Sequence, residues 1–131
     1  MQDLLIDKAI ILRDTTQRLK QLAQPYASGI SLSDQNVMLP LHDACTTCIE
    51  MGAIYLNTRH DQAGKQTHQI FDTLVDLDVI DRALSKRLLS LISFGKLVQH
   101  AHNIKGKKCN VHLREKHLND MQTFTENLLL A

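Results

Sequence analysis

The chain has 131 residues, 44% apolar and 22% charged, which fits one folded domain that buries its own hydrophobic core. Two prolines and five glycines are too few for a disordered chain, and the lack of tryptophan with only 4% aromatic residues argues against a base-stacking RNA-binding sheet. Three cysteines, without a secretory signal, favour a cytoplasmic chain with reduced thiols. No apolar run is long enough to cross a bilayer, so we expect no membrane association.

Positive charge is concentrated in one stretch of the chain. Residues 82–116 contain nine basic residues and one acidic residue, whereas the remainder contains six basic and thirteen acidic residues. The two parts therefore carry +8 and −7, although the whole chain carries only +1. Such a division is typical of a surface that faces a polyanion or an acidic partner. It also arises when solvated helix faces simply differ in charge.

Apolar residues recur at helical spacing in the first half of the chain. The pattern predicts a first helix over Gln2–Ala23 that ends before Pro25. Its inner face carries Leu5, Ala9, Leu12, Leu19 and Ala23. The second helix has the most regular apolar stripe, made of Val37, Leu41, Ala44, Cys48, Met51 and Tyr55. Pro40 lies inside this stripe and predicts either a helix start or a kink.

The second half continues the helical pattern. Residues 60–66 predict a turn, a short helix is expected near His68–Leu77, and Asp78 or Asp81 is expected to cap a fourth helix over Arg82–Ala101. The inner face of that helix carries Ala83, Leu84, Leu88, Leu91, Ile92, Gly95 and Val98. After a basic connector at 103–110, the last helix is expected over Val111–Leu129. Its inner face carries His117, Met121, Phe124 and Leu128. The predicted fold class is all-α, an up-and-down bundle of four or five helices in one domain spanning residues 1–131.

Two of the cysteines have the CxxC spacing of zinc and redox sites. Cys45 and Cys48 lack a second ligand pair at matching spacing, and Cys48 occupies a core position of the helical stripe. Core packing is therefore the favoured interpretation, with metal or redox chemistry as the alternative. Cys109 and His112 lie near the basic connector without a clear partner. We predict no metal and no cofactor.

A basic residue and two histidines stand near the end of the predicted fourth helix, in the sequence FGKLVQHAH at 94–102. Lys96 and His100 are four residues apart and project from the same side of a helix, while His102 lies at or just past its expected end. An imidazole exchanges protons near neutral pH, and a cation stabilises charge growing on a phosphorane. These residues are candidates for metal-free RNA cleavage, with His100 as acid or base, Lys96 as phosphate contact and His102 assisting. The alternative is that cationic side chains merely stabilise a helix C-terminus.

Residues 78–104, DVIDRALSKRLLSLISFGKLVQHAHNI, resemble the signature region of the HepT-like toxin branch of the HEPN superfamily. In that branch, a segment of the form GVI, acid, xELAxRL precedes a helix that ends in Phe-Arg-Asn-x-x-x-His-x-Tyr. Phe94 and His100 match this motif, whereas Gly95, Lys96 and His102 stand at its Arg, Asn and Tyr positions. The resemblance extends over about residues 2–129, most of the chain.

The resemblance implies a small α-helical RNase toxin that forms a homodimer, with the two motif helices facing each other across a shared RNA cleft. It implies cleavage by attack of the ribose 2′-OH on the adjacent phosphate, without metal. It also implies a small nucleotidyltransferase antitoxin that binds the toxin and adenylylates the motif Tyr. The RNA would be held by the basic residues Lys105, Lys107, Lys108, Arg114 and Lys116.

The departures from the motif keep other functions open. Gly95 removes the guanidinium that grips a phosphate, and His102 removes the phenol that accepts AMP. One alternative is a non-catalytic module of the same fold that binds a nucleotidyltransferase, a nucleotide or RNA. Another is a helical dimer with an unrelated scaffold role.

Overall fold

The computed structural model describes residues 2–23, 30–31, 35–105, 112–113 and 115–131. Within these ranges, the side chains at 2–3, 22–23, 30–31, 35–38, 94–95, 97–105, 112–113 and 115 are outside the description. The described residues form five helices: α1 (Gln2–Ala23), α2 (Gln35–His60), α3 (Thr67–Asp76), α4 (Arg82–Lys105) and α5 (Glu115–Leu130). Two short strands, β1 (Ile30–Ser31) and β2 (His112–Leu113), pair antiparallel.

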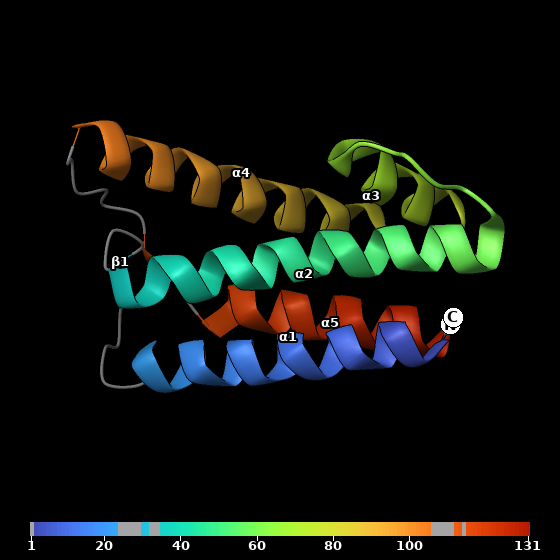
Figure 1. The fold of residues 1–131 in the computed structure, drawn as a ribbon, viewed down its shortest axis with the longest axis horizontal. Helices are drawn as coiled ribbons and strands as arrows, with labels where there is room; N and C mark the ends of the chain where they lie inside the picture. Colours follow the sequence, from blue (N-terminus) through green and yellow to red (C-terminus); the bar gives the residue numbers. More distant parts are fainter. Residues whose placement is uncertain (1, 24–29, 32–34, 106–111, 114) are drawn as a thin grey trace.

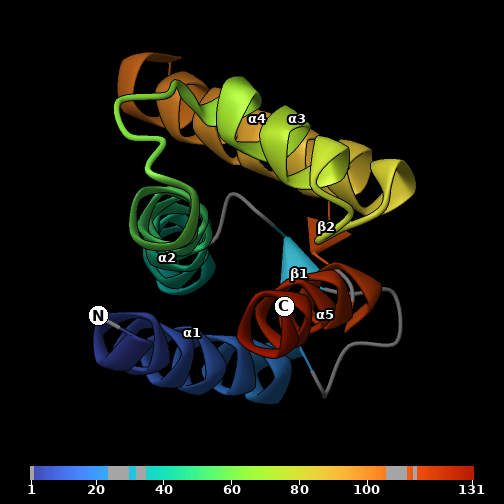
Figure 2. The ribbon, with the colours of Figure 1, turned by 90° about the vertical axis from the view of Figure 1, so that its right-hand side faces the viewer.

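The four long helices α1, α2, α4 and α5 alternate in direction along the bundle (Figure 1). Seen from one end, α1, α2 and α5 surround the core, and α4 closes the opposite side together with α3 (Figure 2). The short helix α3 packs on both α2 and α4. The predicted all-α, up-and-down bundle is confirmed.

The core lies along the common axis of the long helices and receives side chains from every helix. Its largest fully buried side chains include Leu12, Met51, Phe71, Leu88 and Phe124. The rings of Phe71 and Phe124 lie 5.5 Å apart between centroids, so an aromatic contact joins α3 to α5. Burial of this continuous apolar interior is the main force that holds the helices together.

The helix starts are fixed by local hydrogen bonds. At the start of α3, the side-chain oxygen of Gln69 accepts a bond of 2.9 Å from the Gln66 N–H. At the start of α4, Asp81 Oδ1 accepts a bond of 2.7 Å from the Leu84 N–H. Asp78 instead has a φ of +59° in the turn before α4, so Asp81 is the cap. Of the two caps considered from the sequence, only the second is formed.

The inner face of α4 differs from the prediction. Leu84, Leu88, Leu91 and Ile92 are buried as expected, whereas Ala83 is exposed and Ser85 is buried in its place. Ala83 precedes Leu84 by one residue, which turns it about 100° from the inward direction. Gly95 and Val98, also predicted to face inward, lie where side chains are not described.

Three helix boundaries also differ from the prediction. The helix α4 was expected to end at Ala101 but extends to Lys105, so its last turn takes up the start of the expected connector. The helix α5 begins at Glu115 rather than Val111, because the backbone at 112–113 pairs with β1 instead. The helix α2 begins at Gln35 and continues through Pro40, so a start at that proline was wrong.

Candidate active site

Of the predicted site residues on α4, Lys96 is the one whose side chain the structure describes. It is exposed, and its charge acts on the thiol of Cys45, which lies on α2. Burial raises the pKa of Cys45 from 9.0 to about 12, and the nearby ammonium of Lys96 partly opposes that rise. The two residues lie on helices that pack against each other.

His100 and His102 both belong to α4, although their side chains are outside the description. His100 stands one helical turn after Lys96, so the two positions share one side of α4. Because α4 continues to Lys105, His102 is still helical and lies about 200° around the helix from His100. Within one chain, Lys96 and His100 therefore occupy positions on one side of α4, and His102 occupies a position on a different side.

The predicted RNA-holding residues fall mostly outside the described residues. Lys107, Lys108 and Arg114 lie outside them, and Lys105 is the last residue of α4 with no described side chain. Lys116 stands exposed in the first turn of α5. Of the predicted basic surface, only Lys116 can be placed by its side chain.

The two cysteines of the CxxC pair are core residues. Cys45 and Cys48 are buried and unbridged, and burial raises the pKa of both thiols. A neutral, buried thiol behaves as a small apolar side chain, so the core-packing interpretation is confirmed. Among the residues that the structure describes, no three His, Cys, Asp or Glu side chains come together as a metal-binding group.

One exposed histidine, His42, lies on α2. His42 lies one helical turn before Cys45, the residue that senses the charge of Lys96. Helical spacing in the sequence does not reveal which helix packs beside α2. That pairing, of α2 with α4, is set by the tertiary structure.

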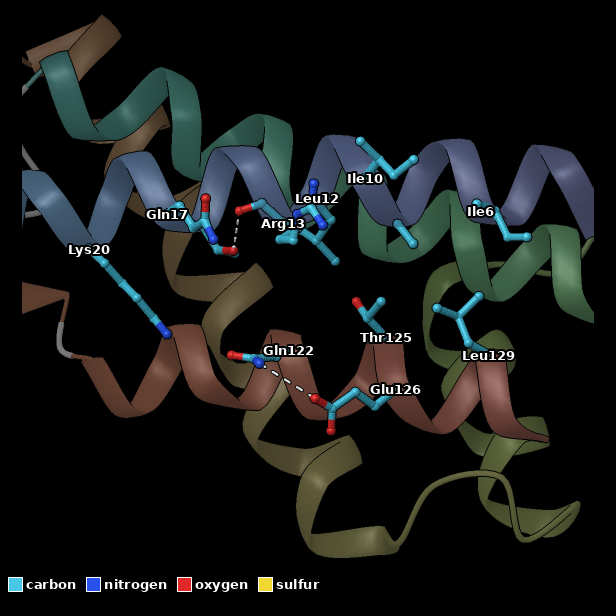
Figure 3. Close-up of a pocket in the computed structure, with 12 residues that line it drawn as sticks. Ile6, Ile10, Leu12, Arg13, Gln17, Lys20, Gln122, Thr125, Glu126 and Leu129 are labelled. Carbon is cyan, nitrogen blue, oxygen red and sulfur yellow. Dashed lines mark hydrogen bonds between the residues drawn. The ribbon is translucent and has the colours of Figure 1, made fainter.

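A groove of about 310 Å³ lies on another side of the bundle, between α1 and α5 (Figure 3). One end is apolar, formed by Ile6 and Leu129, and the other end is polar, with Arg13 and Lys20 on α1. Glu126 on α5 accepts a hydrogen bond of 3.4 Å from Gln122 at its edge. None of the described residues that line this groove is a histidine or a cysteine. No helix in the described part of the chain is long and apolar enough to cross a membrane.

No family model matches the sequence. Among characterised proteins, the chain is 24% identical over 131 residues to the mRNA nuclease HepT of Shewanella oneidensis, covering 96% of both chains. Its fold matches the tri-AMPylated HEPN toxin of the same species, solved in complex with an MNT antitoxin, with a TM-score of 0.71, 18% identity and full coverage of both chains. The chain is thus similar to HepT over nearly its whole length and shares the fold of HEPN toxins.

Two further solved structures share this fold. A mutant of the toxin–antitoxin MntA–HpeT has a TM-score of 0.71 at 16% identity, covering 98% of this chain and 99% of that one. A toxin–antitoxin structure with AMP-PNP has a TM-score of 0.69 at 19% identity, with the same coverage. The likeness spans the whole helical bundle, and α4 is the helix that carries the HepT-like motif region.

Proposed function

We propose that this HepT-like chain is the toxin component of a toxin–antitoxin pair and cleaves RNA without a metal ion. The observation that carries the proposal is the match to an mRNA nuclease over 96% of the chain. The exposed position of Lys96 on α4 supports it, because a phosphate of RNA has free access to that ammonium. The proposed partner is a nucleotidyltransferase antitoxin, as in the MNT complex of the Shewanella HEPN toxin.

The proposed chemistry needs a proton carrier and a cation on one side of α4. His100 exchanges a proton with the ribose 2′-OH or with the leaving 5′-oxygen. Lys96 stabilises the extra negative charge on the phosphorane that forms when the 2′-oxygen attacks phosphorus. The 2′-oxygen loses its proton, the bond from phosphorus to the 5′-oxygen breaks, and that oxygen gains a proton. The products are a 2′,3′-cyclic phosphate and a free 5′-OH.

Several features of the assembled toxin belong to the same proposal. The chain acts in the cytoplasm as one domain and pairs with a second copy through its α4 helices. Lys105, Lys107, Lys108, Arg114 and Lys116 hold the RNA backbone. Because His102 lies about 200° from His100 around α4, we assign it an assisting role only in a site shared by two copies.

The test is RNA cleavage by the purified protein in the presence of a chelator, comparing the parent chain with His100→Ala and His68→Ala. His68 is an exposed histidine on α3 and serves as the matched control. We expect His100→Ala to cleave roughly 10²–10⁴-fold more slowly, the usual contribution of general acid–base catalysis, and His68→Ala to match the parent. Equal cleavage by the parent chain and His100→Ala refutes the assignment.

The second candidate function is a non-catalytic HEPN module that binds the nucleotidyltransferase. It is favoured by Gly95 and His102, which replace the Arg and Tyr of the motif. Tyr55, the tyrosine that the structure describes, is buried at 4% exposure and does not offer a phenol for AMP transfer. A parent chain that fails to cut RNA but co-purifies with a co-expressed nucleotidyltransferase supports this second function.

A further inference from the structure

We propose that the groove between α1 and α5 holds the turn between α3 and α4, residues 76–81, of a second copy of this chain. The groove and the turn are different surfaces, and α1 and α5 lie on the side of the bundle away from α3 (Figure 2). Each chain therefore offers its groove to one neighbour and its turn to another, in a head-to-tail contact. Exposed apolar side chains, opposite charges and a common spacing on the two surfaces carry this assignment. The contact concerns assembly and does not depend on RNA cleavage.

The apolar end of the groove leaves two large side chains of α1 in solvent. Ile6 and Ile10 line this end and are 42% and 44% exposed, and Leu129 of α5 forms the facing wall (Figure 3). Exposed apolar side chains that gather along a groove are typical of a contact with another protein. The groove, with a volume of about 310 Å³, has room for an aliphatic side chain of a partner.

The other end of the groove carries positive charge. Arg13 is 65% exposed and has a loose ion pair, at 3.7 Å, with the equally exposed Asp14. Lys20 points toward α5 and forms no ion pair within the described part of the chain (Figure 3). Glu126 is the one acid among the described lining residues, so the lining carries a net +1. Exposed ion pairs are weak and leave the guanidinium available, so this end favours an acidic partner segment.

The turn between α3 and α4 presents a leucine between two acids. Leu77 is 36% exposed, and Asp76 and Asp78 on either side of it are exposed as well. Neither aspartate forms an ion pair with another described residue. Backbone hydrogen bonds of 3.0 Å from the N–H groups of Leu77, Asp78 and Val79 hold the turn in place. A segment fixed in this way loses little conformational freedom on binding, which favours it as the inserted part of a contact.

The apolar and charged parts of the two surfaces have similar spacing. Neighbouring Cα atoms are about 3.8 Å apart, which separates Leu77 from the aspartate on either side of it. Arg13 follows Ile10 by three residues, a rise of about 4.5 Å along α1. When Leu77 of one copy contacts Ile10 of the next, Asp76 or Asp78 therefore lies within reach of the Arg13 guanidinium. One contact joins apolar to apolar side chains and carboxylate to guanidinium.

Disulfide trapping tests which surface occupies the groove. Chains carrying Ile10→Cys are mixed with chains carrying Leu77→Cys and oxidised with copper phenanthroline, and the linked peptides are identified by mass spectrometry. A disulfide forms only where the two Cα atoms come within about 7 Å, so we expect mainly bridges between position 10 and position 77. A majority of bridges between two copies of position 10 would show a symmetric pairing of α1 and overturn the proposal. The absence of any bridge between positions 10 and 77 overturns it as well.

Charge reversal measures the ionic part of the same contact by sedimentation velocity. The variants are Arg13→Glu, the double variant Asp76→Lys with Asp78→Asn, and a chain that combines all three changes. The control is Arg18→Glu, because Arg18 is an exposed base of α1 that does not line the groove.

Like charges that face each other across an interface disfavour it strongly, so we expect one association step to weaken roughly tenfold or more in Arg13→Glu and in the double variant. The combined chain should recover the association of the parent, and Arg18→Glu should match the parent. Equal effects of Arg13→Glu and Arg18→Glu, or no recovery in the combined chain, would refute the contact. Association is the quantity measured, so a parent chain that does not cleave RNA overturns the proposed function and leaves this result unchanged.

Discussion

Substitution of Gly52 by alanine tests how closely α2 and α3 approach. A Cβ added at Gly52 would lie 2.6 Å from Cγ2 of Ile70, a β-branched side chain that is 3% exposed in the core. Alanine gains about 1 kcal/mol of helix propensity over glycine, and overpacking a filled core costs about 1–3 kcal/mol. We therefore expect Gly52→Ala to lower the free energy of unfolding by about 1 kcal/mol, a loss of roughly 4 °C in Tm.

The effect of Gly52→Ala should change sign when Ile70 is also replaced by alanine. Ile70→Ala removes the carbon that the new Cβ would meet, at a cost of about 2–5 kcal/mol by itself, which is within the usual stability of a domain. In that background, Gly52→Ala should raise the stability by up to about 1 kcal/mol. Ile70→Val keeps both γ carbons and is the matched control, in which Gly52→Ala should still destabilise. Urea unfolding followed by circular dichroism measures all six proteins. The reasoning is refuted if Gly52→Ala has the same effect in every background.

Two further predictions concern a helix cap and the buried thiols. Asp81→Ala removes the acceptor for the Leu84 N–H and should lower the free energy of unfolding, measured in urea, by about 0.5–2 kcal/mol. Asp81→Asn keeps an acceptor oxygen and should recover most of that loss. Equal losses in both variants would contradict a capping role. Burial raises the pKa of Cys45 from 9.0 to about 12, so its thiol should resist iodoacetamide at pH 8 until the protein unfolds. Because the thiol ionises at a lower pH in the unfolded chain, the free energy of unfolding should fall as the pH rises from 9 to 12. Rapid alkylation of the native chain would show that the thiol is not buried.

The sequence by itself determined the helical architecture. The apolar stripe of the second helix, from Leu41 to Tyr55, is buried as predicted, because a 3.6-residue period leaves one face for the core. The same reasoning located α1 to the residue and placed Cys48 in the core. It also located the motif region at FGKLVQHAH, since the order of helices around these residues resembles HepT-like proteins.

The sequence predicted other local features less well, for reasons that lie in the packed structure. Helix α4 continues past Ala101 to Lys105, and α5 starts late because the backbone at 112–113 pairs with β1, 82 residues earlier in the chain at Ile30–Ser31. Neither event has a local signal in the sequence. Ala83 was assigned to the core for its apolar character alone, although its small side chain has little effect on how α4 is oriented.

Only the tertiary structure decided which candidate residues share a surface. The spacing of Lys96 and His100 gives one side of one helix, but nothing local to either residue states which helix lies beside it. The packing of α2 on α4 brings the charge of Lys96 to act on the thiol of Cys45. Residues more than 50 positions apart become neighbours through the burial of the core, because burial selects which helix faces meet rather than which residues are close in sequence.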